Sequence, residues 1–196
     1  MTIRFVVSVA ALVGLTACGG GGDGGIGGGF GSLDQKYDTL FNDLPANSSV
    51  GTNIVDFSGV MFVATDLDPS GGTSDSGYLG SADMSMNFTS GMFTGSATGF
   101  YLVSIDTVTG EPNGFLTTVN PDGSVSSIDV EFNDSGIAGA GFTPAFGGSI
   151  NGDVLGGEGV GTFRGTAGEF VSIIQADGVD GFTVNGNPAD VTIFGN

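Results

Sequence analysis

Histidine and tryptophan are absent from this chain of 196 residues, which holds one cysteine and only three lysine or arginine residues. Without histidine, Ser-His-Asp and Cys-His catalysis are excluded, and so are most transition-metal sites. A single cysteine cannot build an intrachain disulfide framework or a cysteine-cluster zinc site. Three basic residues cannot neutralise a run of phosphates, so we expect no nucleic-acid partner. We also expect no cofactor and no bound metal.

Glycine and acidic residues dominate what remains. The chain contains 39 glycines and 21 aspartates or glutamates, and its formal net charge is -18. Its length fits one domain, or one domain with a tail. So strong a negative charge favours solubility and suits a cationic partner, but it describes the whole surface and marks no particular site.

The first eighteen residues resemble a bacterial lipoprotein signal. Arg4 supplies a positive start, and residues 5–15 form an apolar run too short to span a bilayer as a mature helix. Cys18 follows the run directly, after Leu15 and the small residues Thr16 and Ala17. We predict that residues 1–17 are a signal peptide and that Cys18 carries diacylglycerol as the new N-terminus. The alternative is an ordinary secretory signal with an incidental cysteine.

The resemblance also gives an expected location. Residue 19 is glycine, whereas an aspartate there favours retention in the inner membrane of familiar lipoproteins. We therefore expect a lipid-anchored protein of the bacterial outer membrane that faces the cell surface, with the periplasmic face as the alternative. Residues 18–31 should be a flexible tether, because ten of the thirteen residues 19–31 are glycine.

A short amphipathic helix is predicted over residues 32–44, with a linker that continues to residue 53. Ser32 and Gln35 match a capping box, and Pro45 should end the helix. Its apolar side chains fall on one face, which should pack on the main domain. They are Leu33, Tyr37, Leu40, Phe41 and Leu44.

The remaining chain, 54–196, alternates with the period of a β-strand. Ala82, Met84 and Met86 alternate with polar residues, and a turn at 89–91 leads into a second run, which predicts a hairpin. Short strands separated by turn signals indicate an all-β fold. Further strands are expected at 57–65, 113–119, 124–132, 146–154, 159–166, 168–175 and 182–194.

Many glycines lie inside these strands, and glycine permits the sharp coiling that closes a small barrel. We therefore predict a single antiparallel β-barrel of about eight strands, with a sandwich as the alternative. A barrel of that size is filled by its own side chains. The expected fillers are Phe62, Met84, Met86, Phe88, Phe93, Phe100, Phe132, Phe163 and Phe182.

Two segments resemble small bacterial surface lipoproteins, of the Slam-dependent type, whose barrel is like that of transferrin-binding protein B. The first is the hairpin at 81–100. The second, 157–173, is similar to the family signature G-x-F-x-G-x-x-A-x-E. Gly161, Phe163 and Gly165 match that signature, Ala167 and Glu169 are each displaced by one place, and Arg164 and Thr166 replace the usual Tyr and Pro.

The resemblance implies a binding module with a barrel fold, but the chain has room for only one barrel. Transferrin binding therefore does not carry over, and no family binding residue maps onto this sequence. We expect a non-enzymatic module for a protein or polar solute, recognised on the loops and outer wall. The alternatives are a structural envelope lipoprotein without a soluble ligand and a carbohydrate-acting enzyme.

Carboxylate pairs are the enzymatic candidates. Asp129 and Glu131 lie two residues apart on one strand, and Glu158 and Glu169 flank another strand pair. Nothing in the sequence separates these acids from the rest. A calcium loop is the remaining candidate, although the usual spacing is absent. Its oxygen ligands would come from Asp66, Asp68 and Asp75.

We predict that Cys18→Ala leaves the domain folded but releases it from the membrane, because acyl chains supply the anchoring energy. The measurement is fractionation of membranes washed in high salt, with the folded state followed by circular dichroism. Pelleting of the variant at the wild-type level would contradict the lipid anchor.

Overall fold

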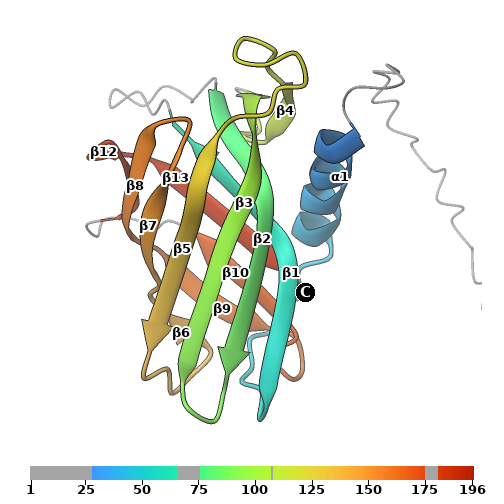
Figure 1. Cartoon of the computed structure of the whole chain (residues 1–196). Helices are drawn as coiled ribbons and strands as arrows, with labels where there is room; N and C mark the ends of the chain where they lie inside the picture. The colour runs from blue at the N-terminus through green and yellow to red at the C-terminus, as the bar shows by residue number, and fades with distance from the viewer. Residues whose placement is uncertain (1–27, 66–75, 107, 175–180) are drawn as a thin grey trace, which may run out of the picture.

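The computed structural model describes residues 28–65, 76–106, 108–174 and 181–196. One helix, α1 (Gly28–Asn42), precedes an antiparallel sheet that curls into a half-barrel, with α1 against one side (Figure 1). The strands are β1 (Ile54–Ala64), β2 (Ser76–Asn87), β3 (Met92–Ile105), β4 (Pro112–Phe115), β5 (Ser127–Ser135), β6 (Gly141–Phe142), β7 (Ala145–Ile150), β8 (Asp153–Glu158), β9 (Val160–Arg164), β10 (Phe170–Ile174), β11 (Thr183–Val184), β12 (Asn187–Pro188) and β13 (Asp190–Gly195).

Hydrogen bonds join the strands in the order β12-β11-β8-β7-β5-β3-β2-β1-β13-β10-β9-β6, and β4 pairs with β3. The all-β expectation is confirmed, and so is the hairpin at 81–100, which forms the facing halves of β2 and β3. Its turn is held by the side chain of Asn87, whose Oδ1 accepts hydrogen bonds from the backbone of Thr89 and Ser90.

The expected count of about eight strands is wrong, because the sheet has thirteen. One predicted strand, 146–154, is two strands, because Asn151 adopts a positive φ of 53° and turns the chain between β7 and β8. Another, 182–194, is divided in the same way at Asn185. The strand expected at 113–119 ends at Phe115.

Other strands are short because the pairing between two neighbouring segments is interrupted, although the register is the same on both sides of the interruption. Ile150 lies opposite Asp153 in the pair β7–β8, and Gly141 lies opposite Thr162 in the pair β6–β9. Both pairs belong to one antiparallel register. Pro144 lies at the gap between β6 and β7; its carbonyl still accepts a hydrogen bond from Gly159, but proline has no N–H to donate.

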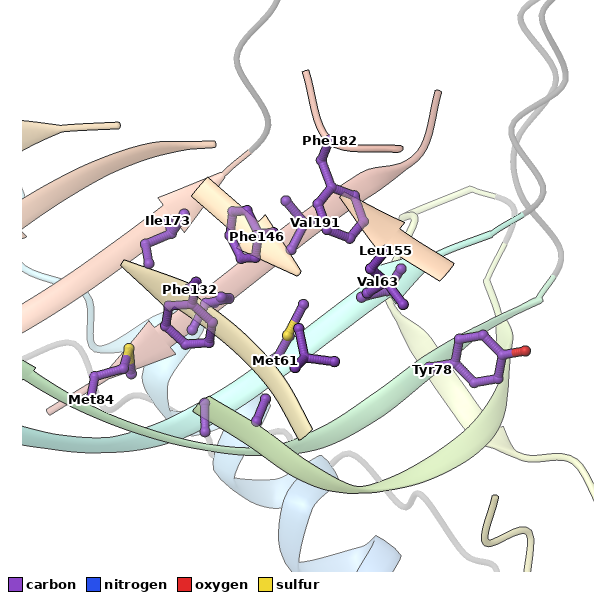
Figure 2. Packing of buried hydrophobic residues seen from close by; sticks show 14 of the residues in the cluster. Met61, Val63, Tyr78, Met84, Phe132, Phe146, Leu155, Ile173, Phe182 and Val191 are labelled. Atoms are coloured by element: carbon purple, nitrogen blue, oxygen red, sulfur yellow. The ribbon is translucent and has the colours of Figure 1, made fainter. Parts of the chain in front are cut away.

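The first buried cluster fills the interior of the curled sheet, between strands that face each other across it. Phe163 is its aromatic centre, with ring centroids of Phe142 at 4.5 Å, Phe88 at 5.0 Å, Phe93 at 5.9 Å and Phe57 at 6.1 Å. Figure 2 shows side chains from opposite strands converging in this interior. The expected fillers found in the cluster are Met84, Met86, Phe93, Phe100, Phe132, Phe163 and Phe182, with the partly buried Phe88 packed against it.

The second buried cluster lies between α1 and the outer face of the sheet. Tyr37 and Leu40 of the helix pack on Val60 and Phe62 of β1 and on Phe194 of β13. The expectation that the helix packs on the main domain is therefore confirmed. The assignment of Phe62 to the interior is wrong, because this position of β1 faces the helix.

The helix begins earlier than its sequence indicated. It starts at Gly28, inside the segment expected as a tether, and Phe30 is buried against the sheet. Ser32 is therefore inside the helix, and the predicted capping box at Ser32 and Gln35 is wrong. Within the described ranges, no helix combines the length and apolar character needed to cross a bilayer.

We predict that Phe163→Ala lowers the free energy of unfolding by about 3–5 kcal/mol, because it leaves a cavity among four other rings. Phe41→Ala is the matched control, since Phe41 is 47% exposed and should lose less than about 1.5 kcal/mol. Urea unfolding measures both changes. Equal losses would show that Phe163 is not central to the interior.

Candidate functional site

The predicted lipidation motif lies outside the described residues, as does the calcium-loop candidate. The first comprises Leu15, Thr16, Ala17 and Cys18, and the second comprises Asp66, Asp68 and Asp75. Among the residues that the structure describes, no three His, Cys, Asp or Glu side chains are grouped so that they could hold a metal ion.

The predicted carboxylate pairs are differently placed. Asp129 and Glu131 both lie exposed on β5, where a bulge falls between Ile128 and Glu131. Glu158 is exposed at the end of β8, opposite Ala145. Glu169 lies in the turn that precedes β10, and its carboxylate accepts hydrogen bonds from the backbone N–H groups of that turn. Glu158 and Glu169 therefore lie in two different local structures.

The outer face of β1, β2, β3, β5, β7 and β8 carries polar side chains in register, and we call this face the outer wall. Adjacent strands lie roughly 5 Å apart, so side chains paired in register are neighbours. One row across the wall is Ser58, Asp83, Ser96, Glu131, Gly147 and Gly156. The row beside it is Asp56, Ser85, Thr94, Asn133, Ala145 and Glu158.

Two neighbouring grooves hollow this wall and share Glu131 and Asn133 in their linings, and we call the two grooves together the trough. The first, over β1 to β5, has a volume of about 720 Å³ and carries the carboxylates of Asp56, Asp83 and Glu131. The second, over β5 and β7, has a volume of about 770 Å³ and adds the carboxylate of Asp129. The lining of the trough therefore combines hydroxyl, amide and carboxylate groups with apolar residues such as Ile128 and Ala145.

Many acids of the sheet region fall into one of two classes. Turn acids accept hydrogen bonds that hold a turn or a hairpin end; for example, Asp134 accepts from the N–H of Thr143. The turn acids are Asp106, Asp122, Asp134 and Glu169.

The second class, the wall acids, has no such role. Each is exposed, and none has a hydrogen bond or ion pair with another described residue. They are Asp56, Asp83, Asp129, Glu131 and Glu158. Like charges on one face repel, and no contact within the described chain offsets that repulsion. The wall acids are thus the carboxylates left available to a partner.

Neither cation in the described ranges forms an ion pair with a carboxylate of the trough. Lys36 of α1 donates to the hydroxyl of Ser58 at 2.9 Å, at the β1 margin of the wall. Arg164 donates from Nε to the hydroxyl of Ser172 at 3.0 Å and from Nη1 to the carbonyl of Pro45 at 3.3 Å. Arg164 therefore fastens the segment after α1 to the sheet.

A polar network lies at one end of the interior of the half-barrel. The hydroxyl of Tyr78 donates to Asp153 at 2.8 Å, and Nδ2 of Asn185 donates to the other oxygen of that carboxylate at 2.8 Å. Burial raises the pKa of Tyr78 to about 12. In Figure 2 the Tyr78 hydroxyl points away from the apolar cluster. This network joins β2 to the β8 and β11 ends and leaves no donor for a ligand on Tyr78.

Sequence reasoning missed Asp56, Asp83 and Asn133 as members of one surface. The alternation around residue 83 placed that side chain on a polar face, but only the strand register shows which polar faces become neighbours. No protein-family model matches this chain, and no curated protein matches it at a significant level. Function must therefore be argued from the wall itself.

Glu169 gives a prediction about pH. Hydrogen bonds from the backbone of Thr166 at 3.0 Å and Ala167 at 2.7 Å lower the pKa of Glu169 to about 2 from an ordinary 4.5. A carboxyl with a depressed pKa stabilises the fold fully above its unfolded pKa, and loses that stabilisation as pH falls toward the folded pKa. Glu169→Gln should therefore melt below wild type at pH 6, and the gap should narrow between pH 4.5 and pH 2.

Thermal melts at several pH values measure this gap. Glu131→Gln is the matched control, because the Glu131 carboxylate accepts no hydrogen bond from a described residue, so this variant should not melt below wild type at pH 6. A Glu169→Gln gap that stays constant from pH 6 down to pH 2 would contradict the role given to the turn.

Proposed function

We propose that this protein is a non-enzymatic binding module, anchored through a lipid on Cys18 to the outer membrane and facing the cell surface, which engages a cationic partner on its outer wall. The observation that carries the proposal is the set of wall acids in the trough. Their carboxylates have no hydrogen bond or ion pair with a described residue; of the two described cations, Arg164 binds Ser172 and Lys36 binds the hydroxyl of Ser58 at the β1 margin of the wall.

Packing supports recognition on the outside. The side chains between the two walls are aromatic and aliphatic, and the large ones are less than a tenth exposed. A small barrel filled by its own side chains has no room for a ligand of substantial size. Polar groups and charge are concentrated instead on the outer wall, where charge complementarity gives specificity and a fast encounter.

Closure of the curled sheet into a barrel is part of the proposal. The segment β6–β7 pairs with β5 on one side, and with β8 and β9 on the other. From β9 the pairing continues through β10, β13, β1, β2 and β3 back to β5. This circuit supports the kind of barrel implied by the resemblance to transferrin-binding protein B-like lipoproteins.

We predict that Asp83→Asn/Glu131→Gln weakens binding of a hexalysine peptide by about three- to tenfold, because it removes two trough carboxylates. The binding of wild type should itself weaken as salt rises from 50 to 300 mM, since exposed charges are screened. Isothermal titration calorimetry on the full mature chain measures both effects.

The matched control is Asp38→Asn/Asp43→Asn, which removes the same charge from exposed positions in and just after α1. It should bind hexalysine nearly as wild type does. If both double variants weaken binding equally, the peptide responds to net charge and the trough is not the site.

A further inference from the structure

The hollow over β5 and β7 has a floor without side chains. Gly147 lies between Glu131 and Gly156 in the wall row, and a Cβ added at Gly147 would meet nothing within 4 Å. Neither Gly147 nor Gly156 has a positive φ. At Gly148, by contrast, φ is +142° and a Cβ would lie 2.7 Å from the backbone of Val130. The fold requires glycine at 148 and not at 147.

A glycine inside a strand costs stability, and such positions mark a bulge, a tight bend, or a close approach by a ligand or another backbone. The bulge of β5 lies opposite this part of β7 and accounts for Gly148, whose Cβ would meet Val130, but not for the open space at Gly147. Valine or threonine would suit an exposed strand position better. The open floor therefore points to a group that lies directly on the strand backbone at Gly147.

The rim of this hollow has two chemistries. Ile128, Ser149 and Val154 form the neighbouring row, in register across β5, β7 and β8. Ile128 is 72% exposed and Val154 is 61% exposed, so two aliphatic side chains stand in solvent beside the floor. Carboxylates of Asp129 and Glu131 stand at the β5 side of the same hollow.

A lysine side chain has the two properties that fit this rim, an aliphatic part and a positive charge. Its aliphatic stem packs along apolar surface while its ammonium remains at a wet, charged edge. The glycine floor and the two aliphatic side chains suit the stem, and the carboxylates of Asp129 and Glu131 suit the ammonium. A simple diffuse negative charge would not need the exposed Ile128 or the bare floor.

We propose that the hollow over Gly147 seats a lysine side chain of a partner polypeptide, with the stem on Gly147 and Ile128 and the ammonium at Asp129 and Glu131. This inference rests on the proposed function and adds the group that is recognised. It requires a cationic side chain with a stem long enough to lie on Gly147 and Ile128. Charge attraction alone would not require a particular length.

The experiment compares three six-residue peptides of equal charge at pH 6: hexalysine, hexaornithine and hexa-diaminobutyrate, which differ by one methylene per side chain. A buried stem makes each methylene removed weaken binding by about two- to fourfold. In Gly147→Val, the valine fills the hollow, so we expect weaker hexalysine binding and a nearly flat series.

Gly141→Val is the matched control. Gly141 is an exposed glycine of β6 in the same long hairpin, and a Cβ there would have its nearest neighbour 3.9 Å away. Gly141→Val should bind the three peptides as wild type does, and thermal melts should show both valine variants folded.

A flat peptide series on wild type, or Gly147→Val that binds hexalysine as tightly as Gly141→Val, would overturn the lysine seat. If Asp83→Asn/Glu131→Gln still weakens hexalysine in that case, the cationic-partner function stands without the seat. If that double variant binds as wild type does, the proposed function itself falls.

Discussion

The ring of Phe163 lies among four other phenylalanine rings, and the packing of the two walls depends on these contacts. Through Phe93 at 6.1 Å from Phe132, then Phe146 and Phe182, the contacts continue along the interior. Aromatic rings bury large areas and pack in defined orientations. Because the inner face is occupied in this way, the outer face is left to carry both the helix and the polar chemistry.

The outer face is accordingly divided between two uses. Where β1, β2, β3 and β13 present aliphatic and aromatic side chains outward, α1 covers them, and Tyr37 and Phe62 meet at 5.9 Å. Where the same strands present hydroxyls and carboxylates, nothing described covers them. Lys36 stands at the boundary, since it extends from the covering helix to Ser58 on the polar side.

Local pattern was enough to predict the fold class, the hairpin at 81–100 and most of the interior side chains. Alternation determines which side of a strand faces inward, and Met84 and Met86 follow it directly. The hydrophobic pattern did not predict the face on which Phe62 lies, because a buried side chain on the outer face cannot be distinguished from one on the inner face until the helix is placed. The turn at Asn151 could have been predicted, because Asn-Gly is a strong hairpin signal that lies inside an apparently continuous run.

The trough could not be predicted from sequence, because it is assembled from five strands whose register is set by bulges and turns. Glu131 lies opposite Gly147 only because β5 has an extra residue between Ile128 and Glu131. A shift of one residue would turn the wall acids inward. The turn acids are different, because each accepts its hydrogen bonds from residues that are close in sequence or in the same hairpin.

Phe30 meets Tyr101 at 5.9 Å and Phe115 at 5.4 Å, which places the start of α1 at the end of the half-barrel where β3 leads into β4 (Figure 1). The β2–β3 turn lies at the other end of β3. The outer wall lies between these two ends, so a partner on the wall would contact the strands along their length and would leave both ends of the half-barrel uncovered.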